Sequence, residues 1–316
     1  ADESHMVKSA SAQRSKALYS LKARKKVFLT GTPILNRPIE LFPQLHYLDP
    51  DHWGSAFKFA RQYCNAHQSQ WGWDFSGASH LDELNDKLQG VMIRRLKKDV
   101  LKELPPKVRQ IVPITPNGAE GLIKEQWAAW ETHRAGGEDY DAQVEELDGS
   151  AGAALGEMAR LRLALGIAKV PAVIEVVKNG MEAGKIVVFC HHRAVQDALM
   201  TEFGDAAVLH RGGLTETEKQ SAVDRFQNDP AIRVFVGSIR ASGVGLTLTA
   251  SAHIVFAEQD WTPAVISQCE DRCHRIGQQE SLLVQHLVFD GSLDATMVQR
   301  QMEKQDVIDA VVDGQP

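Results

Sequence analysis

The sequence has little of what marks membrane proteins or disulfide-stabilised secreted proteins. Its 316 residues include only four cysteines, which favours a reducing compartment. No apolar run approaches the roughly 20 residues that a membrane-spanning helix needs, so no membrane partner is expected. A net positive charge is also missing, because 35 Lys and Arg stand against 41 Asp and Glu and leave a formal charge of −6. A global attraction to nucleic acid is therefore excluded, and any DNA contact must be local.

The sequence also lacks the loop with which many nucleotide-hydrolysing enzymes bind phosphate. That loop reads Gly, any four residues, and then Gly-Lys-Ser or Gly-Lys-Thr. At the nearest candidate, Gly184-Lys185, Asn179 stands in place of the first Gly and Ile186 in place of the hydroxyl residue. Nucleotide hydrolysis would therefore need residues that precede Ala1. Because the first residues include neither an initial Met nor the apolar core of a signal peptide, we expect a fragment of a longer chain.

What is present predicts about two globular domains. With 43% hydrophobic and 24% charged residues, the chain has the composition of an ordinary globular protein. Residues 26–30 are typical of a short buried strand that ends at Gly31. Helical spacing follows over 40–102, and Pro105-Pro106 is expected to end a helix in the basic stretch 91–110. The aromatic residues of this region are interpreted as packing residues: Trp53, Phe57, Phe59, Tyr63, Trp71 and Trp73.

The second half of the chain has a different pattern. Residues 117–160 hold ten acidic and three basic residues and indicate an exposed helical insert. From Lys185 onward, short apolar runs alternate with helical segments, which predicts an α/β fold with a parallel sheet and helices on both faces. The expected strands are 186–190, 207–210, 233–237, 253–257 and 282–289, and the expected helices are 194–202, 215–227, 263–274 and 294–311. Ligands bind beyond the carboxyl ends of such strands, so the loops there are candidate sites.

Two segments outside the sheet interior have residue types suited to phosphate chemistry. Asp2 and Glu3 are adjacent carboxylates that could hold a magnesium ion and polarise a water molecule, although Ser4-His5-Met6 also matches the remnant of a cloning site. The turn from Ser242 to Thr247 contains two glycines. These let backbone amides approach a phosphate closely, or they simply form a tight turn.

A third such segment runs from Gln268 to Gln278. Arg272 and Arg275 are three residues apart, so on a helix both guanidinium groups would project from one face toward a triphosphate. An arginine placed in this way stabilises the charge that builds on a transferred phosphoryl group. Two cysteines and a histidine in the same segment suggest a metal site, but no second cluster completes four ligands, so zinc is not expected.

Taken in order, these segments resemble motifs two to six of helicase superfamily two. The matching stretches are Asp2 to His5, Leu29 to Pro33, Val188 to His192, Ser242 to Leu246 and Gln268 to Gln278. Three stretches resemble the Swi/Snf-type DNA translocases in particular: Met92 to Val100, Leu104 to Lys107 and Arg272 to Gln278. Phe256-Ala257-Glu258, with Trp261 and Pro263, is similar to the annealing-helicase, or HARP-like, branch. The resemblance covers nearly the whole chain.

The resemblance implies RecA-like lobes, partial for lobe one and complete for lobe two, around a cleft that binds ATP and magnesium. Asp2 and Glu3 would bind magnesium and activate water, while Arg272 and Arg275 would reach the phosphates from lobe two. Gln268, Gly243 and Gly245 would line the cleft, and Thr30 and Thr32 would couple hydrolysis to DNA. Loops facing the DNA backbone would carry His191, His192, Arg193, Arg211 and Ser238.

The predicted division gives residues 1–110 to lobe one with a helical insertion, 111–184 to a linker and helical segment, and 185–316 to lobe two. The predicted function is the carboxyl-terminal part of a DNA-stimulated ATPase that moves on or remodels duplex or branched DNA, and that needs the missing amino-terminal half of lobe one. The alternative is a non-catalytic nucleic-acid-binding or assembly module. An RNA helicase is disfavoured by the Swi/Snf-type pattern. The expected location is cytoplasm or nucleoid for a bacterial or viral source, and nucleus for a eukaryotic one.

Overall fold

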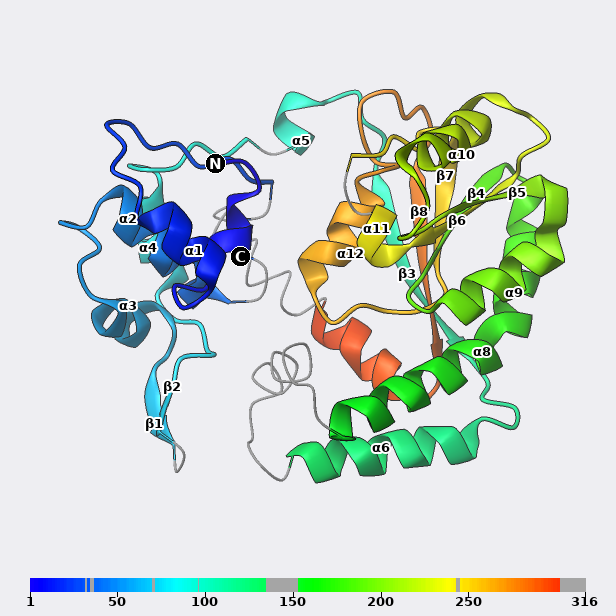
Figure 1. Cartoon of the computed structure of the whole chain (residues 1–316), viewed down its shortest axis with the longest axis horizontal. Coiled ribbons are helices and arrows are strands. Elements are labelled where there is room, and N and C mark those ends of the chain that lie inside the picture. The colour runs from blue at the N-terminus through cyan, green and yellow to red at the C-terminus, as the bar shows by residue number, and fades with distance from the viewer. Residues whose placement is uncertain are drawn as a thin grey trace.

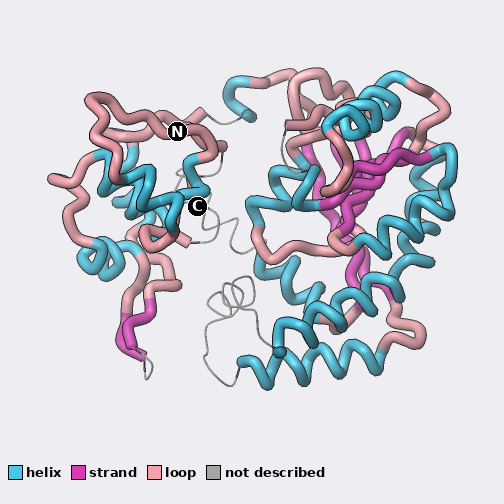
Figure 2. Tube along the Cα trace, in the orientation of Figure 1, coloured by secondary structure: helices cyan, strands magenta, loops and turns pink. Residues whose placement is uncertain are grey.

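The computed structural model describes residues 1–31, 33–34, 37–69, 72–95, 97–134, 153–242 and 245–301. These residues form a smaller, mainly helical part and a larger part built around a parallel sheet (Figure 1, Figure 2). The short helix α5 (Lys97–Val100) lies between the two parts in Figure 1.

The smaller part takes in the first elements of the chain. In order these are η1 (Ser4–Val7), α1 (Gln13–Tyr19), η2 (Pro38–Leu41), α2 (Phe42–Leu48), α3 (Ala56–Tyr63), β1 (His67–Ser69), β2 (Gly72–Asp74) and α4 (Leu81–Leu88). Its core joins Leu41, Leu45, Leu84 and Leu88 to aromatic side chains. Trp53, Phe59 and Tyr63 pack there, as predicted.

Not every aromatic residue of this part is buried. Phe57 is 41% exposed and Trp73 is 47% exposed, and their ring centroids lie 4.8 Å apart. The packing role predicted for these two residues is therefore only partly right, because the short β1–β2 hairpin places Trp73 at the surface. Trp71 lies outside the described residues.

The buried strand predicted over 26–30 does not form. The backbone of this stretch pairs with the chain start, since Leu29 N donates to Ala1 O at 2.8 Å and Ser4 N donates to Leu29 O at 3.0 Å. Val27 is 64% exposed and Leu29 is 58% exposed. The prediction of burial is wrong here because, within the described residues, no core packs against these apolar side chains.

The basic stretch 91–110 is not one helix either. Among the described residues of this stretch only α5 is helical, so the predicted helix ends at Val100, and the prediction that it ends at the prolines is wrong. Arg94 and Lys97 instead donate hydrogen bonds to the carbonyl oxygens of Gly31 and His274. The backbone of this stretch is therefore positioned by contacts with other segments.

The larger part begins with β3 (Lys107–Ile114), α6 (Glu120–Arg134) and α8 (Ala153–Met181). The elements that follow are β4 (Lys185–Cys190), α9 (Arg193–Phe203), η3 (Gly204–Ala206), β5 (Ala207–His210), α10 (Glu216–Asn228), β6 (Val234–Ser238), α11 (Ile239–Ser242), β7 (Ser251–Phe256), α12 (Pro263–Glu270) and β8 (Leu282–Phe289). A final helix is described over 293–301. The rest of the helix predicted to reach residue 311 lies outside the described residues.

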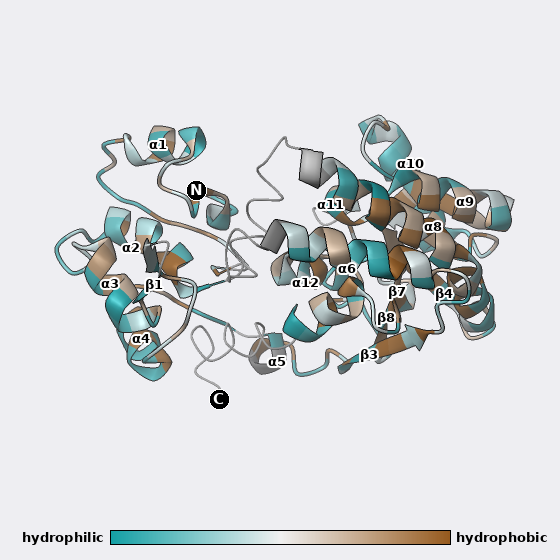
Figure 3. Cartoon of the chain, turned by 90° about the horizontal axis from the view of Figure 1, so that it is seen from below, coloured by the Kyte–Doolittle hydropathy of each residue, from teal (hydrophilic) through white to brown (hydrophobic). Residues whose placement is uncertain are grey.

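The sheet has six parallel strands in the order β3-β8-β7-β4-β6-β5. Alternate residues of a strand face opposite sides. Along β4, Val187 and Phe189 pack in a cluster with α10 and α12, whereas Ile186 and Val188 pack in a cluster with α8 and α9. The predicted α/β fold with helices on both faces is confirmed, and Figure 3 shows hydrophobic residues concentrated on the strands.

Two predicted boundaries fall inside regular elements. The division at residue 110 lies within β3, which pairs with β8 over its whole length. The helical insert predicted over 117–160 corresponds to α6 and the start of α8, and residues 135–152 lie outside the described part. Among the described helices, none is long and apolar enough to cross a membrane.

A buried carboxylate joins the edge strand β3 to α12. Glu270 is fully buried, and its Oε2 lies 2.6 Å from Nζ of Lys107. Arg109 donates through Nε to Oε1 at 2.8 Å and through Nη2 to Oε2 at 2.7 Å. Burial alone would raise the pKa of Glu270, but Lys107 and Arg109 outweigh burial and lower it to about 2. The two cations therefore stabilise a charge that has no access to water.

We predict that Glu270→Gln lowers the free energy of unfolding of the larger part by about 3–5 kcal/mol, because it breaks a buried ion pair on one side. Since the folded pKa is depressed, the contribution of Glu270 is complete above the ordinary value of 4.5 and is lost as the pH falls toward 2. Urea unfolding at pH 7 and pH 3 measures both effects. The matched control is Glu157→Gln at an exposed ion pair with Arg160. Equal stability of Glu270→Gln and the wild type at pH 7 would contradict the prediction.

Candidate functional site

The carboxyl ends of the parallel strands meet at one edge of the sheet. The loop after β4 carries His191 and His192, β6 ends at Ser238, and Glu258 follows β7. Arg211 follows β5 at the same edge. Arg193 is the first residue of α9 and lies at this edge as well. The topology therefore brings the five residues predicted to face DNA to the edge at which ligands of such sheets bind.

Glu258 holds the loop after β4 in place. Its Oε2 accepts hydrogen bonds from the backbone amides of His191 and His192, both at 2.8 Å, and its Oε1 lies 2.6 Å from Nδ1 of His192. A Cβ on Gly166 of α8 would lie 2.5 Å from Oε1 of Glu258, so glycine leaves room for the carboxylate. Burial alone would raise the pKa of Glu258, but the contacts with His192 hold it below its ordinary value.

The role of Glu258 was not predicted from the sequence. Its position could have indicated a role, because Glu258 comes soon after the buried strand β7 and next to the loop that follows the adjacent strand β4. A buried carboxylate at such a point requires donors, and backbone amides of the neighbouring loop supply them.

The charge at this edge comes from its arginines. Burial, with smaller contributions from Arg162 and His192, lowers the pKa of His191 to about 4, so this imidazole is neutral near pH 7. Arg193 is exposed and donates through Nη2 to the carbonyl oxygen of Gly212 at 3.1 Å. Arg211 forms an ion pair with Asp197 at 2.6 Å.

The carboxylate segment at the chain start contacts the segment that ends at Gly31. Nδ1 of His5 lies 2.9 Å from Oγ1 of Thr30 and 3.2 Å from Oε2 of Glu3. Asp2 and Glu3 are exposed, and Glu3 has a left-handed backbone with φ of 47°. His5 is 6% exposed, and burial lowers its pKa. The structure thus brings Thr30 to the carboxylates, while Thr32 lies outside the described residues.

Arg272 and Arg275 do not lie on a helix, contrary to the prediction. The helix expected to run to residue 274 ends at Glu270. Arg272 and Arg275 follow it in a turn that leads to Gly277, whose φ is 103°. Lys97, Lys107 and Arg109 contact the residues at this helix end.

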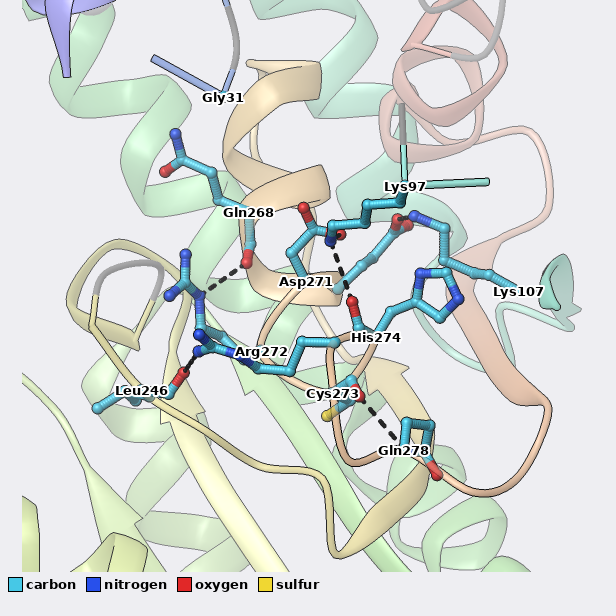
Figure 4. A network of polar contacts seen from close by, with 12 residues as sticks. Gly31, Lys97, Lys107, Leu246, Gln268, Asp271, Arg272, Cys273, His274 and Gln278 are labelled. Carbon is cyan, nitrogen blue, oxygen red and sulfur yellow. Dashed lines mark hydrogen bonds and ion pairs between the residues drawn. The ribbon is translucent and has the colours of Figure 1, made fainter. Parts of the chain in front are cut away.

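The turn with the two arginines is joined to the glycine turn that follows α11. Nη1 of Arg275 donates to Leu246 O at 2.7 Å, and Leu248 N donates to Arg272 O at 2.8 Å. Nε of Arg272 donates to Gln268 O at 3.0 Å (Figure 4). Gly245 has φ of 75°, which favours glycine. Gly243 lies outside the described residues.

The carboxylate segment and the arginine turn also influence each other. Burial lowers the pKa of Arg272, Arg275 lowers it further, and Asp271, Cys269 and Glu3 oppose that shift. Glu3 therefore lies close enough to act on the Arg272 guanidinium electrostatically. In addition, Arg94 donates to Gly31 O at 3.0 Å. Two of the four residues predicted to be catalytic, Glu3 and Arg272, are thus brought into the same region.

The donor atoms present suit a magnesium ion that arrives with a nucleotide better than a resident metal. The described residues contain no cluster of three or more His, Cys, Asp or Glu side chains able to hold a metal. Magnesium keeps several water ligands and takes one or two carboxylates together with phosphate oxygens. Asp2 and Glu3 could supply the carboxylates. All four cysteines are buried and free.

Comparison with known proteins finds two domain families in the chain. Residues 1–136 match the SNF2-related domain, and residues 168–277 match the helicase conserved C-terminal domain. The protein named "DNA annealing helicase and endonuclease ZRANB3" from Bos taurus is 39% identical over 308 residues, which are 94% of this chain and 28% of the relative. The "SWI/SNF-related matrix-associated actin-dependent regulator of chromatin subfamily A-like protein 1" from Xenopus tropicalis is 36% identical over 301 residues, 93% of this chain and 31% of the relative.

The chain therefore spans less than a third of the length of these two relatives. Among solved structures, the "Sulfolobus solfataricus SWI2/SNF2 ATPase core in complex with dsDNA" is 22% identical, with a TM-score of 0.45, and the match covers 98% of this chain and 68% of that one. The two matched domains together take in most of the residues. The chain thus carries an SNF2-related domain followed by a helicase conserved C-terminal domain.

Proposed function

We propose that this chain is the carboxyl-terminal part of a DNA-stimulated ATPase that moves along or remodels duplex or branched DNA. The proposal includes a phosphate-binding loop supplied by residues upstream of Ala1, since the sequence contains none. It is supported by the family and by relatives whose names include DNA annealing helicase and chromatin regulator.

Each residue near the proposed cleft has a distinct task. Asp2 and Glu3 hold magnesium with the nucleotide, and Glu3 orients the attacking water. Arg272 and Arg275 stabilise the negative charge that grows on the transferred phosphoryl group. The residues Gln268, Gly243 and Gly245 line the nucleotide site, and Thr30 and Thr32 connect it to DNA.

One observation carries this proposal further than the family does. The segment of Glu3 contacts Thr30 through His5, and the Glu3 charge acts on Arg272, although 269 residues separate the two in sequence. A carboxylate and a guanidinium from distant segments are thus held in the same region, and phosphoryl transfer uses both kinds of group. A module that only binds nucleic acid would not need the two groups in one region.

We predict that the chain, extended upstream to include the phosphate-binding loop, hydrolyses ATP and is stimulated by duplex DNA. Arg272→Ala and Arg275→Ala should each lower kcat by about 10³-fold or more, the range found for arginines that contact a transferred phosphoryl group. Glu3→Gln should abolish turnover and leave ATP binding in place. A phosphate-release assay with and without duplex DNA measures the rates, and these 316 residues alone, expected to be inactive, serve as the control.

An Arg275→Ala variant with the wild-type rate would contradict the assignment of the arginine. An extended protein without activity would leave the non-catalytic binding or assembly module as the better description. Stronger stimulation by RNA than by DNA would point to an RNA helicase instead.

We further propose that the carboxyl edge of the larger sheet faces the DNA backbone, through His191, His192, Arg193, Arg211 and Ser238. His191 is neutral near pH 7 and Arg211 is paired with Asp197, so Arg193 supplies the exposed charge. Contacts of this kind give affinity without reading sequence.

Arg193→Ala should weaken duplex binding by the extended protein to a similar degree for all DNA sequences. It should also reduce the slope of log K against log salt by about one. Fluorescence anisotropy over a salt series measures both quantities. The matched control is Arg225→Ala in the last turn of α10, which leads to the opposite edge of the sheet. An unchanged salt slope would contradict the proposed contact.

The division into residues 1–110, 111–184 and 185–316 is likewise proposed, with β3 as the strand that enters the second lobe. The relatives compared above are animal proteins, and for a eukaryotic source we expect a nuclear location.

A further inference from the structure

Two side chains of the segment between the two parts of the molecule contact the proposed site from different sides. Nη1 of Arg94 donates to the carbonyl oxygen of Gly31 at 3.0 Å. Nζ of Lys97 lies 2.7 Å from Oδ1 of Asp271 and donates to the carbonyl oxygen of His274 at 3.0 Å. Asp271 and His274 flank Arg272 in the sequence, so one ammonium group holds both sides of the turn that carries it (Figure 4).

These contacts complete a path from the carboxylates to the arginine turn. Gly31 follows Thr30, whose hydroxyl bonds to His5, and His5 lies next to Glu3. From Gly31 the path continues through Arg94 and, three residues later, through Lys97 to the turn. Each step is a hydrogen bond, an ion pair or a few residues of chain, so the path physically connects the Gly31 loop to the turn that carries Arg272.

The contacts of Lys97 differ from those that residues 105–109 make with the end of α12 and with His274. Lys107 and Arg109 bind Glu270, which is fully buried, and Nε2 of His274 donates to Pro105 O at 2.8 Å. In contrast, the side chains of Lys97 and Asp271 are 40% and 37% exposed. The pair is partly exposed, although burial lowers the pKa of Lys97, and a partly exposed ion pair adds less to stability than a buried one. The loss of Lys97 should therefore leave the sheet folded and release only the turn.

We propose that Arg94 and Lys97 are positioning residues, which link the Gly31 loop to the turn of Arg272 and so place its guanidinium according to the state of the carboxylate segment. This inference rests on the proposed function, because it assigns Arg272 to a nucleotide phosphate. Neither Arg94 nor Lys97 touches the nucleotide in this arrangement, and both act through Arg272.

The test uses the upstream-extended protein and four variants. Lys97→Met should lower kcat for DNA-stimulated ATP hydrolysis by about 10- to 100-fold, the effect of a small misplacement of a catalytic group, with KM for ATP nearly unchanged. Lys97→Arg, which keeps the charge, should restore most of the rate, and Arg94→Ala should act in the same direction as Lys97→Met. The matched control is Lys178→Met, which removes another exposed ion pair, with Glu202, on α8.

A double-mutant cycle tests whether Lys97 acts through Arg272. In the Arg272→Ala background, Lys97→Met should have no further effect on kcat, because the group it positions is absent. Independent effects that multiply would overturn the proposal, as would an unchanged kcat in Lys97→Met or an equal loss in Lys178→Met.

Hydrogen exchange separates this inference from the proposed function. In the same extended protein, Lys97→Met should speed exchange at the amides of Arg272 and His274, which bond to Cys269 O and Glu270 O, and leave exchange in β4 and β7 unchanged. If the wild type hydrolyses no ATP, the proposed function is wrong, and exchange alone then decides whether Lys97 holds the turn. Unchanged exchange at those two amides would overturn the link itself.

Discussion

The buried carboxylate of Glu270 is the interaction on which the geometry of the candidate site depends. It lies without access to water between Lys107 and Arg109, and a buried charge of this kind is stable only while both cations stay in place. The edge strand β3, the last residue of α12 and the start of the arginine turn are therefore fixed relative to one another. Arg272 follows two residues later, so the ion pair between Arg109 and Glu270, which are 161 residues apart in sequence, anchors the start of the turn that carries Arg272.

The parallel sheet provides the second constraint. Because all six strands run in the same direction, their carboxyl ends deliver loops from separate stretches of the chain to one edge. Glu258 then ties the loop after β4 to the end of β7 through two backbone amides. The fold thus supplies a rigid edge, and the chemistry is added by side chains in its loops.

The strands between residues 185 and 289 could be predicted closely, since each is an apolar run bounded by turn-forming residues; β8 covers Leu282–Phe289, the range expected. β3 could not, because its charged and prolyl residues do not resemble a buried strand and its place comes from pairing with β8. The prediction for residues 26–30 was wrong for the opposite reason. Their composition is typical of a buried strand, but among the described residues no core packs against Val27 and Leu29. Arg272 and Arg275 were predicted from their motif and their spacing, and their catalytic role stays a prediction. Glu270, Lys107 and Arg109 were missed as an ion-pair group, because separation in the sequence hides which charges meet.

Residues 97–109 make both strong and weak contacts with residues 270–274, and the two kinds of contact restrict the arginine turn to different degrees. Lys107 and Arg109 bind a carboxylate that has no alternative partner in water, so their contacts persist in any state in which the sheet is folded. Lys97 binds the partly exposed carboxylate of Asp271, which water can also solvate, so breaking this contact costs less than breaking those of Glu270. A conformational equilibrium can be shifted by a ligand only through free-energy differences between its states. A weak, exposed contact beside a strong, buried one therefore lets the arginine turn move without loss of its attachment to the fold.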